Sequence, residues 1–339
     1  MPLRGGGLLA DLGPLADGLT NYRQDAFPGS FATSSLGPEL YSVPFTVAPL
    51  GLWYHKKSLE HAGISDPATT IDELNDQLEI LRNKKLSDDA MPIRVDFTGA
   101  EYSLTAFWPW IWSFGGNPLE YGEDESVALN WTDPGTFNAF QWAQDLIDKG
   151  YAPDTPTGWW DRARFAYGGV AYKVDGPYLR GHFSGLNPKL RTVESINDQY
   201  GVTPIPKGPG SAASVTIADD HSLAISADAN DQQLAWTLIR FLTTNDESIR
   251  SFLGPQGGLL PVLSQNSLPR YKKYYSDEIT RAFLEKIAPT MRRLPSGRLY
   301  SQAAVLIAQT LKEIALTPGS DVMDHLVTLN GDLESLYEQ

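Results

Sequence analysis

Residues 41–54 read YSVPFTVAPLGLWY. Residues 41–47 are rich in apolar and β-branched side chains, which favours a strand, and residues 50–54 predict a second strand after the break at Pro49. The chain has 339 residues, of which 42% are hydrophobic. A single core stops growing near ~250–300 residues. We therefore expect two lobes, with residues 41–54 crossing between them.

Helical and strand-like segments alternate through the rest of the chain. Thr70 and Glu73 form a capping box ahead of three leucines at helical spacing, and Gly150 is placed to end a helix over residues 134–149. Further helices are expected at 231–243, 301–315 and 321–336, and strands at 169–174 and 223–225. In the first of these helices we expect four apolar side chains to face inward: Leu234, Leu238, Phe241 and Leu242. The alternation predicts an α/β architecture with parallel sheets.

Charge and composition exclude several classes of partner. The chain carries 27 basic and 41 acidic residues, which argues against nucleic acid, because binding to phosphate backbones depends on clustered Lys and Arg. No apolar run approaches the ~20 residues that span a bilayer, and the first residues lack the apolar segment of a signal peptide. Cysteine is absent and the five histidines show no metal-binding spacing. We expect no nucleic acid, no metal and no cofactor.

The sequence also lacks the common catalytic signatures. There is no GxSxG elbow, no phosphate-binding P-loop and no GxGxxG between a strand and a helix. Acidic clusters at residues 123–125 and 219–220 contain paired carboxylates, but glycoside hydrolysis needs two acids that face each other across the bond to be broken. We expect no catalytic residues and a protein that is not an enzyme.

Seven short motifs occur in order along the chain: GLLADL at 7–12, VPF at 43–45, LWYHK at 52–56, the capping box at Thr70, SFGG at 113–116, DGPY at 175–178 and PIPKG at 204–208. Together they resemble the maltose-binding-protein type of bacterial extracellular solute-binding protein. His55 stands where this family has the Asn of a YNK motif, and Tyr178 where it has the Trp of an NGPW motif. The resemblance implies a two-lobe, periplasmic-binding-protein-like (type II) fold with a hinge and an interlobe cleft. It assigns residues 1–47 and 220–275 to the first lobe, and residues 48–219 and 276–339 to the second.

The chain departs from the family at its beginning. The family opens with strand–helix units that start the first sheet and hold part of the sugar site, and this sequence begins after them. Two βαβ units of ~30 or more residues each would account for roughly 60–90 residues. We expect a first lobe that is incomplete at its N-terminus, with exposed sheet edges that favour aggregation and weaken ligand binding.

The resemblance points to seven ligand-binding candidates. Tyr178 matches the family's stacking Trp, and Trp108 lies seven residues before Gly115, where the family's helix presents aromatic rings. The other five candidates are Trp159, Asp219, Asp220, Arg298 and Tyr300. For each of them an ordinary role in packing, or at a solvated turn, is the competing interpretation. Ala48 stands where the maltose receptor has a cleft glutamate, which argues against a site identical to that receptor's.

The function implied is that of the substrate-binding component of an ABC importer. Such a protein binds a sugar or oligosaccharide between two lobes, works as a monomer with permease subunits, and is extracellular or periplasmic, with or without a membrane anchor. Three alternatives stay open: a receptor for another polar solute such as a polyamine or a sugar phosphate, a carbohydrate-active hydrolase, and an interaction protein without a transport role.

Overall fold

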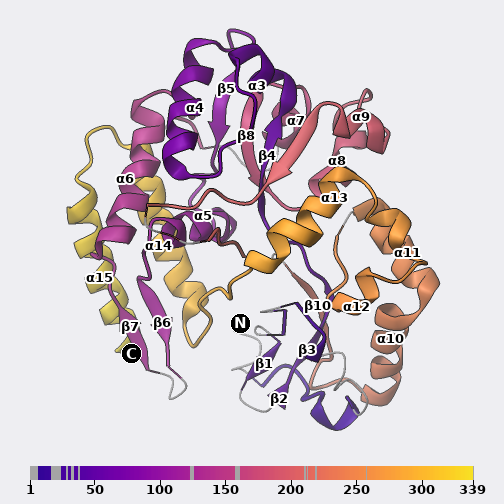
Figure 1. The fold of residues 1–339 in the computed structure, drawn as a ribbon. Helices are drawn as coiled ribbons and strands as arrows, with labels where there is room; N and C mark the ends of the chain where they lie inside the picture. The colour runs from indigo at the N-terminus through magenta and orange to yellow at the C-terminus, as the bar shows by residue number, and fades with distance from the viewer. Residues whose placement is uncertain are drawn as a thin grey trace.

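The computed structural model describes residues 7–16, 24–27, 30–31, 34–36, 39–122, 126–156, 161–209, 211, 213–217, 220–256 and 258–338. The segment at residues 41–54 forms strand β3 (Ser42–Thr46), a break, and strand β4 (Gly51–His55), as predicted. The two strands belong to different sheets. Residues 47–50 therefore lead the chain from one part of the molecule into another (Figure 1).

The larger sheet has four strands in the order β5-β8-β4-β9, with bounds Met91–Arg94, Val170–Asp175, Gly51–His55 and Tyr200–Thr203. β5 and β8 run parallel, while β4 is antiparallel to both β8 and β9. The prediction of parallel sheets therefore holds for the β5–β8 pair and is wrong for the pairs that β4 forms. β4 enters the centre of the sheet directly from β3, in the opposite direction to the two strands on either side of it.

Helices cover both faces of this sheet. Side chains alternate between faces along a strand, so Leu52 and Trp53 of β4 pack into two different hydrophobic clusters. The helices and short strands that follow β4 are α3 (Lys56–Ala62), α4 (Ile71–Asn83), α5 (Glu101–Ser113), β6 (Leu119–Tyr121), β7 (Val127–Leu129), α6 (Pro134–Asp148), α7 (Asp161–Ala166), α8 (Leu179–Leu186), α9 (Val193–Asn197), α14 (Tyr300–Leu316) and α15 (Val322–Tyr337). The largest cluster joins α4, α5 and α6 to α14 and α15, which come from the end of the chain.

Local signals in this region are confirmed. Thr70 accepts a hydrogen bond from the Glu73 backbone at 3.1 Å, and the Glu73 carboxylate accepts one from the Thr70 backbone at 3.2 Å. These two bonds satisfy donors at the start of α4 that the helix itself leaves unpaired. Gly150 follows α6 with φ +67°, a conformation that favours glycine.

The second sheet is small and lies in the lower part of Figure 1. β3 pairs antiparallel with β10 (His221–Ala224), so residues near 45 and 222 meet although the whole of the larger sheet lies between them in sequence. The remaining elements of the described chain are η1 (Gly13–Leu15), β1 (Ser35–Leu36), β2 (Glu39–Leu40), α10 (Gln232–Thr244), α11 (Asp246–Gln256), α12 (Leu263–Asn266), η2 (Lys272–Tyr274), α13 (Glu278–Ala282), η3 (Phe283–Ile287) and η4 (Ala288–Thr290). Two hydrophobic clusters combine residues between 10 and 47 with residues between 249 and 291 or between 225 and 262, whereas Ile279, Phe283 and Ile287 of α13 and η3 pack against the larger sheet.

One sequence prediction fails on α10. Leu234, Leu238 and Phe241 are 66%, 57% and 52% exposed, and the buried face of the helix is formed by Trp236, Ile239 and Thr243. Both faces of this helix carry apolar residues at helical spacing. Periodicity alone therefore could not identify the buried face.

Candidate functional site

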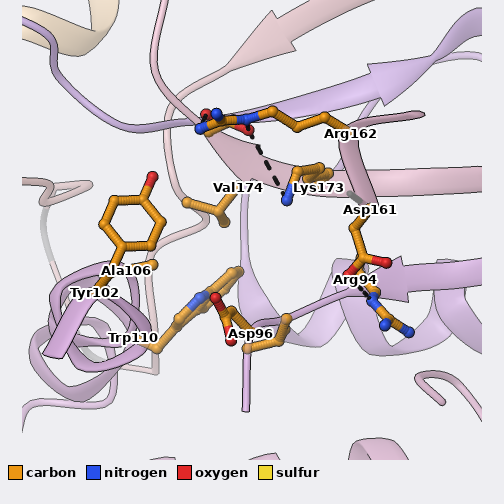
Figure 2. A pocket seen from close by; sticks show the side chains of 11 residues that line it. Arg94, Asp96, Tyr102, Ala106, Trp110, Asp161, Arg162, Lys173 and Val174 are labelled. Carbon is orange, nitrogen blue, oxygen red and sulfur yellow. Dashed lines mark hydrogen bonds and ion pairs between the residues drawn. The ribbon is translucent and has the colours of Figure 1, made fainter. Parts of the chain in front are cut away.

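A pocket of about 60 Å³ lies where β5 and β8 end, beside helices α5 and α7 (Figure 2). Arg94 and Lys173 are register partners at the ends of the two parallel strands, so both reach the same edge of the sheet. Tyr102 and Trp110 come from α5 and form part of the wall. Six charged side chains line the pocket: Arg94, Asp96, Asp161, Arg162, Lys173 and Asp175.

Arg94 and Asp161 form a buried ion pair at one side of the pocket. Both side chains are almost fully buried, and the Arg94 guanidinium donates to the Asp161 carboxylate. Burial lowers the pKa of Arg94, and the attraction and hydrogen bond of Asp161 oppose this effect. The pair is neutral overall and fixes the start of α7 against the end of β5.

Arg162 and Asp175 form a second ion pair with two parallel hydrogen bonds. Arg162 Nε and Nη2 donate to the two Asp175 oxygens at 2.8 and 2.9 Å. Burial alone would lower the pKa of Arg162, but the attraction and hydrogen bonds of Asp175 raise it above its ordinary value. This bidentate geometry is rigid and directional. It holds the end of β8 in position before the turn at residues 175–178.

Tyr178 follows that turn and, although it does not itself line the pocket, contacts two residues that do, Tyr102 and Arg162. Its hydroxyl is 3.0 Å from the hydroxyl of Tyr102, and the Arg162 guanidinium lies 5.2 Å from the centre of its ring. The ring folds back over Gly176, where a Cβ atom would lie 2.4 Å from a ring carbon. Only glycine leaves room for this orientation. The structure thus brings Tyr178 close to the pocket, and its contact with a solute stays a prediction.

Trp108 and Tyr300 are brought together, but inside the protein. Trp108 Nε1 donates to the Tyr300 hydroxyl at 3.1 Å, and the Trp108 ring packs against those of Trp112 and Trp131. The Trp108 side chain has no exposed surface and Tyr300 is 9% exposed. Burial explains the raised pKa of Tyr300. Neither residue lines the pocket, and in this conformation Trp108 offers no surface that a solute could contact.

The remaining candidates lie away from the pocket or outside the described residues. Trp159 and Asp219 are not among the residues that the structure describes. Asp220 directly precedes β10, and Arg298 is an exposed residue in the loop before α14. Leu299, next to Arg298, has φ +62°, which is unusual for a residue with a side chain. Neither Asp220 nor Arg298 is among the residues that line the pocket.

Sequence reasoning missed several pocket residues, although two of them left a signal. Arg94 and Lys173 interrupt the otherwise uncharged strand segments MPIRV and GVAYKV, and charged residues are rarely buried in strands without a partner. Asp96, Tyr102 and Arg162 left no comparable signal, because their proximity arises only when α5 and α7 pack beside β5 and β8.

Among the described residues, no group of three His, Asp or Glu side chains is placed to hold a metal ion. In the same part of the chain, no helix has the length and apolar character that crossing a membrane requires.

Comparisons with known proteins identify the class. The sequence profile described as bacterial extracellular solute-binding protein matches residues 3–279. The chain therefore belongs to this family of extracellular solute-binding proteins. A putative binding protein of Brucella abortus (strain 2308) is 25% identical over 316 residues, covering 90% of this chain and 71% of the relative. The maltotriose-binding protein of Pyrococcus abyssi is 24% identical over 235 residues, which cover 66% of this chain and 44% of the relative.

Solved structures show the same fold. Maltose-bound MalE3 of T. maritima matches with a TM-score of 0.82 and 21% identity, covering 99% of this chain and 82% of that chain. UgpB from Mycobacterium tuberculosis, solved in complex with glycerophosphocholine, matches with a TM-score of 0.81 and 20% identity. The match covers 99% of this chain and 81% of that chain. The α/β fold expected from the sequence is therefore confirmed as that of the two-lobe binding proteins.

Proposed function

We propose that this chain is the substrate-binding component of an ABC importer, and that it binds a sugar or oligosaccharide at the pocket beside Tyr102 and Tyr178. The observation that carries the proposal is the combination of aromatic rings with fixed charged groups at one concave site. Sugar rings present apolar faces for stacking and hydroxyl groups for hydrogen bonding, and such a site serves both.

The relatives support carbohydrate as the solute. Proteins of this fold have been solved with maltose, as in MalE3, and one is described as a cyclic alpha-maltosyl-1,6-maltose binding protein of Arthrobacter globiformis. Tyr178 ends a rigid turn and is half-buried, so its ring is held in place before a solute arrives. A ring that is already ordered loses little conformational entropy on binding.

The proposal includes the two lobes predicted from the sequence. Pairing of β3 with β10 supports residues 1–47 and 220–275 as one lobe, and the large cluster supports residues 48–219 and 276–339 as the other. The 275/276 boundary has weaker support, because Ala288 and Met291 pack with Val47 and Tyr271. Closure of the lobes on the solute, delivery to permease subunits, a monomeric state and an extracellular or periplasmic location belong to the same proposal.

A binding role fits the pocket carboxylates better than glycoside hydrolysis does. Asp161 and Asp175 are both held by arginines in ion pairs. A hydrolase needs one acid that can give up a proton opposite a second carboxylate. These ion-paired groups are better suited to positioning than to proton transfer.

A thermal-shift screen of mono- and oligosaccharides tests the proposal. A solute at ~100 times its Kd should stabilise the protein by about 2.7 kcal/mol. Tyr102→Ala should reduce the shift, whereas Tyr167→Ala, which removes an exposed tyrosine outside the pocket, should leave it unchanged. If no saccharide shifts the unfolding temperature of the unaltered protein, the carbohydrate proposal is wrong.

A further inference from the structure

Lys173 presents a largely buried ammonium group inside the pocket. Its side chain is 13% exposed, and Figure 2 shows it reaching from β8 into the space across from Tyr102. The ammonium lies 3.8 Å from Asp175 Oδ2, which is too long for a hydrogen bond. Within the described chain, Lys173 Nζ makes no hydrogen bond. Three donors are therefore available to a bound molecule.

The Asp175 carboxylate is hydrogen-bonded to Arg162 and to the backbone that follows it, and not to Lys173. Oδ2 accepts from Arg162 Nε, while Oδ1 accepts from Arg162 Nη2 and from the backbone of Gly176 at 2.9 Å. Burial of a charged group is costly unless it is paired and hydrogen-bonded. Lys173 is thus the surplus cation of a group in which Arg162 and Asp175 already neutralise each other.

Charge is distributed unevenly around the pocket. Arg162, Lys173 and Asp175 together carry one net positive charge, and the Arg94–Asp161 pair carries none. Asp96 adds a carboxylate just after the end of β5, and its Oδ1 accepts a hydrogen bond from the Thr98 backbone at 2.9 Å. The pocket therefore has a positive side at β8 and a negative, hydrogen-bond-accepting side after β5.

From this arrangement we infer that the solute is a polyhydroxylated molecule with an anionic group, either a carboxylate or a phosphate. The anionic group binds Lys173 Nζ, and hydroxyl groups of the solute donate to Asp96. This inference rests on the proposed function, since it names the class of solute that the same site takes. Lys173 is then the residue that selects acidic over neutral sugars, because a charge-assisted hydrogen bond in a partly buried site is stronger than a neutral one.

The test compares matched pairs of solutes by isothermal titration calorimetry: glucose with glucuronate and with glucose 6-phosphate, galactose with galacturonate, and glycerol with glycerol 3-phosphate. We expect the anionic member of at least one pair to bind about tenfold more tightly than its neutral partner. The carboxylate and phosphate arms identify which anionic group the site prefers. Higher ionic strength should reduce the preference, since salt screens charge interactions.

Lys173→Met keeps the length and volume of the side chain and removes its charge, so it should abolish the preference without lowering the unfolding temperature. Lys173→Arg should retain it. The control is Lys149→Met, which removes a lysine that pairs with Asp145 on α6 and does not line the pocket. That control should leave the preference unchanged.

The outcomes separate this inference from the proposed function. Equal binding of neutral and anionic partners, or a preference that survives in Lys173→Met, overturns the inference alone. A large drop in unfolding temperature for Lys173→Met would assign Lys173 to a structural ion pair and also overturn it. Binding of no member of any pair, nor of any saccharide in the wider screen, overturns the proposed function as well.

Discussion

The hydroxyl groups of Tyr102 and Tyr178 lie 3.0 Å apart beside the pocket, although 76 positions separate the two residues. Tyr102 comes from α5, and Tyr178 follows the turn after β8. The Arg162 guanidinium lies against the Tyr178 ring and is itself fixed by Asp175. One ion pair thus positions both the end of β8 and the aromatic ring that follows it.

Tyr178→Ala is expected to weaken solute binding about tenfold, because it removes a preordered ring beside the pocket. Tyr178→Phe keeps the ring and loses only the hydroxyl contact with Tyr102, so it should weaken binding by about threefold or less. Calorimetric titration of both variants with the solute found in the screen measures the difference. A Phe variant as weak as the Ala variant would show that the hydroxyl matters rather than the ring.

The Arg94–Asp161 pair gives a prediction about stability. Asp161→Asn leaves the Arg94 guanidinium buried without its counter-charge, and should lower the free energy of unfolding by about 3–5 kcal/mol. Asp145→Asn breaks an exposed pair with Lys149 and should cost at most about 1 kcal/mol. Urea denaturation of the two variants compares them directly. Equal losses would mean that burial does not set the strength of the Arg94 pair.

The burial of His55 should make the free energy of unfolding sensitive to acid. Burial, with a smaller contribution from Lys57, lowers the pKa of His55 to about 4. An unfolded histidine titrates near 6.5, so between pH 6.5 and 4 the unfolded state binds a proton that the folded state does not. The stabilising contribution of His55 is therefore fully present above pH 6.5. As the pH falls from 6.5 toward 4, the free energy of unfolding should decrease by up to about 3 kcal/mol.

Comparison with His55→Gln isolates this effect from that of other titrating groups. The variant loses the contact of His55 Nδ1 with Ser58 Oγ at 2.8 Å, so its stability at pH 7 should fall, but its acid slope should be shallower. Free energies of unfolding at pH 7, 5.5 and 4.5 would show this. Parallel pH curves for the two proteins would exclude His55 as the source of the slope.

Local signals predicted this fold well where a few neighbouring residues decide the conformation. The capping box at Thr70 needs only Thr70 and Glu73, and the stop at Gly150 needs only a left-handed residue after a helix. Residues 41–54 were predicted as two strands for the same reason. These interactions are formed within one turn or one strand, so the sequence contains all the partners.

The site could not be derived in the same way, because its partners are distant in sequence. Arg94 and Asp161 are 67 positions apart, and nothing near either residue indicates the other. Trp108 was selected by its spacing from Gly115, yet α5 is buried on nearly all sides, so spacing could not distinguish a cleft residue from a core residue. Its Nε1 instead finds Tyr300, from the far end of the chain.

Three exposed apolar side chains form a stripe along α10. Leu234, Leu238 and Phe241 lie on one face at i, i+4 and i+7, and all three are more than half exposed. Replacing each with Gln removes exposed apolar surface and keeps a good helix former. The free energy of unfolding should therefore change by about 0.5 kcal/mol or less at each site, while aggregation on heating should decrease.

Ile239→Ala on the opposite face provides the matched control, because Ile239 is 5% exposed and packs with Trp236 and Val43 in the core. It should lower the free energy of unfolding by about 2–5 kcal/mol. Urea denaturation and light scattering during a temperature ramp measure the two quantities on the same samples. A loss from the Gln substitutions as large as that of Ile239→Ala would mean that the stripe is buried in solution, and that the inward orientation first expected from the sequence was right.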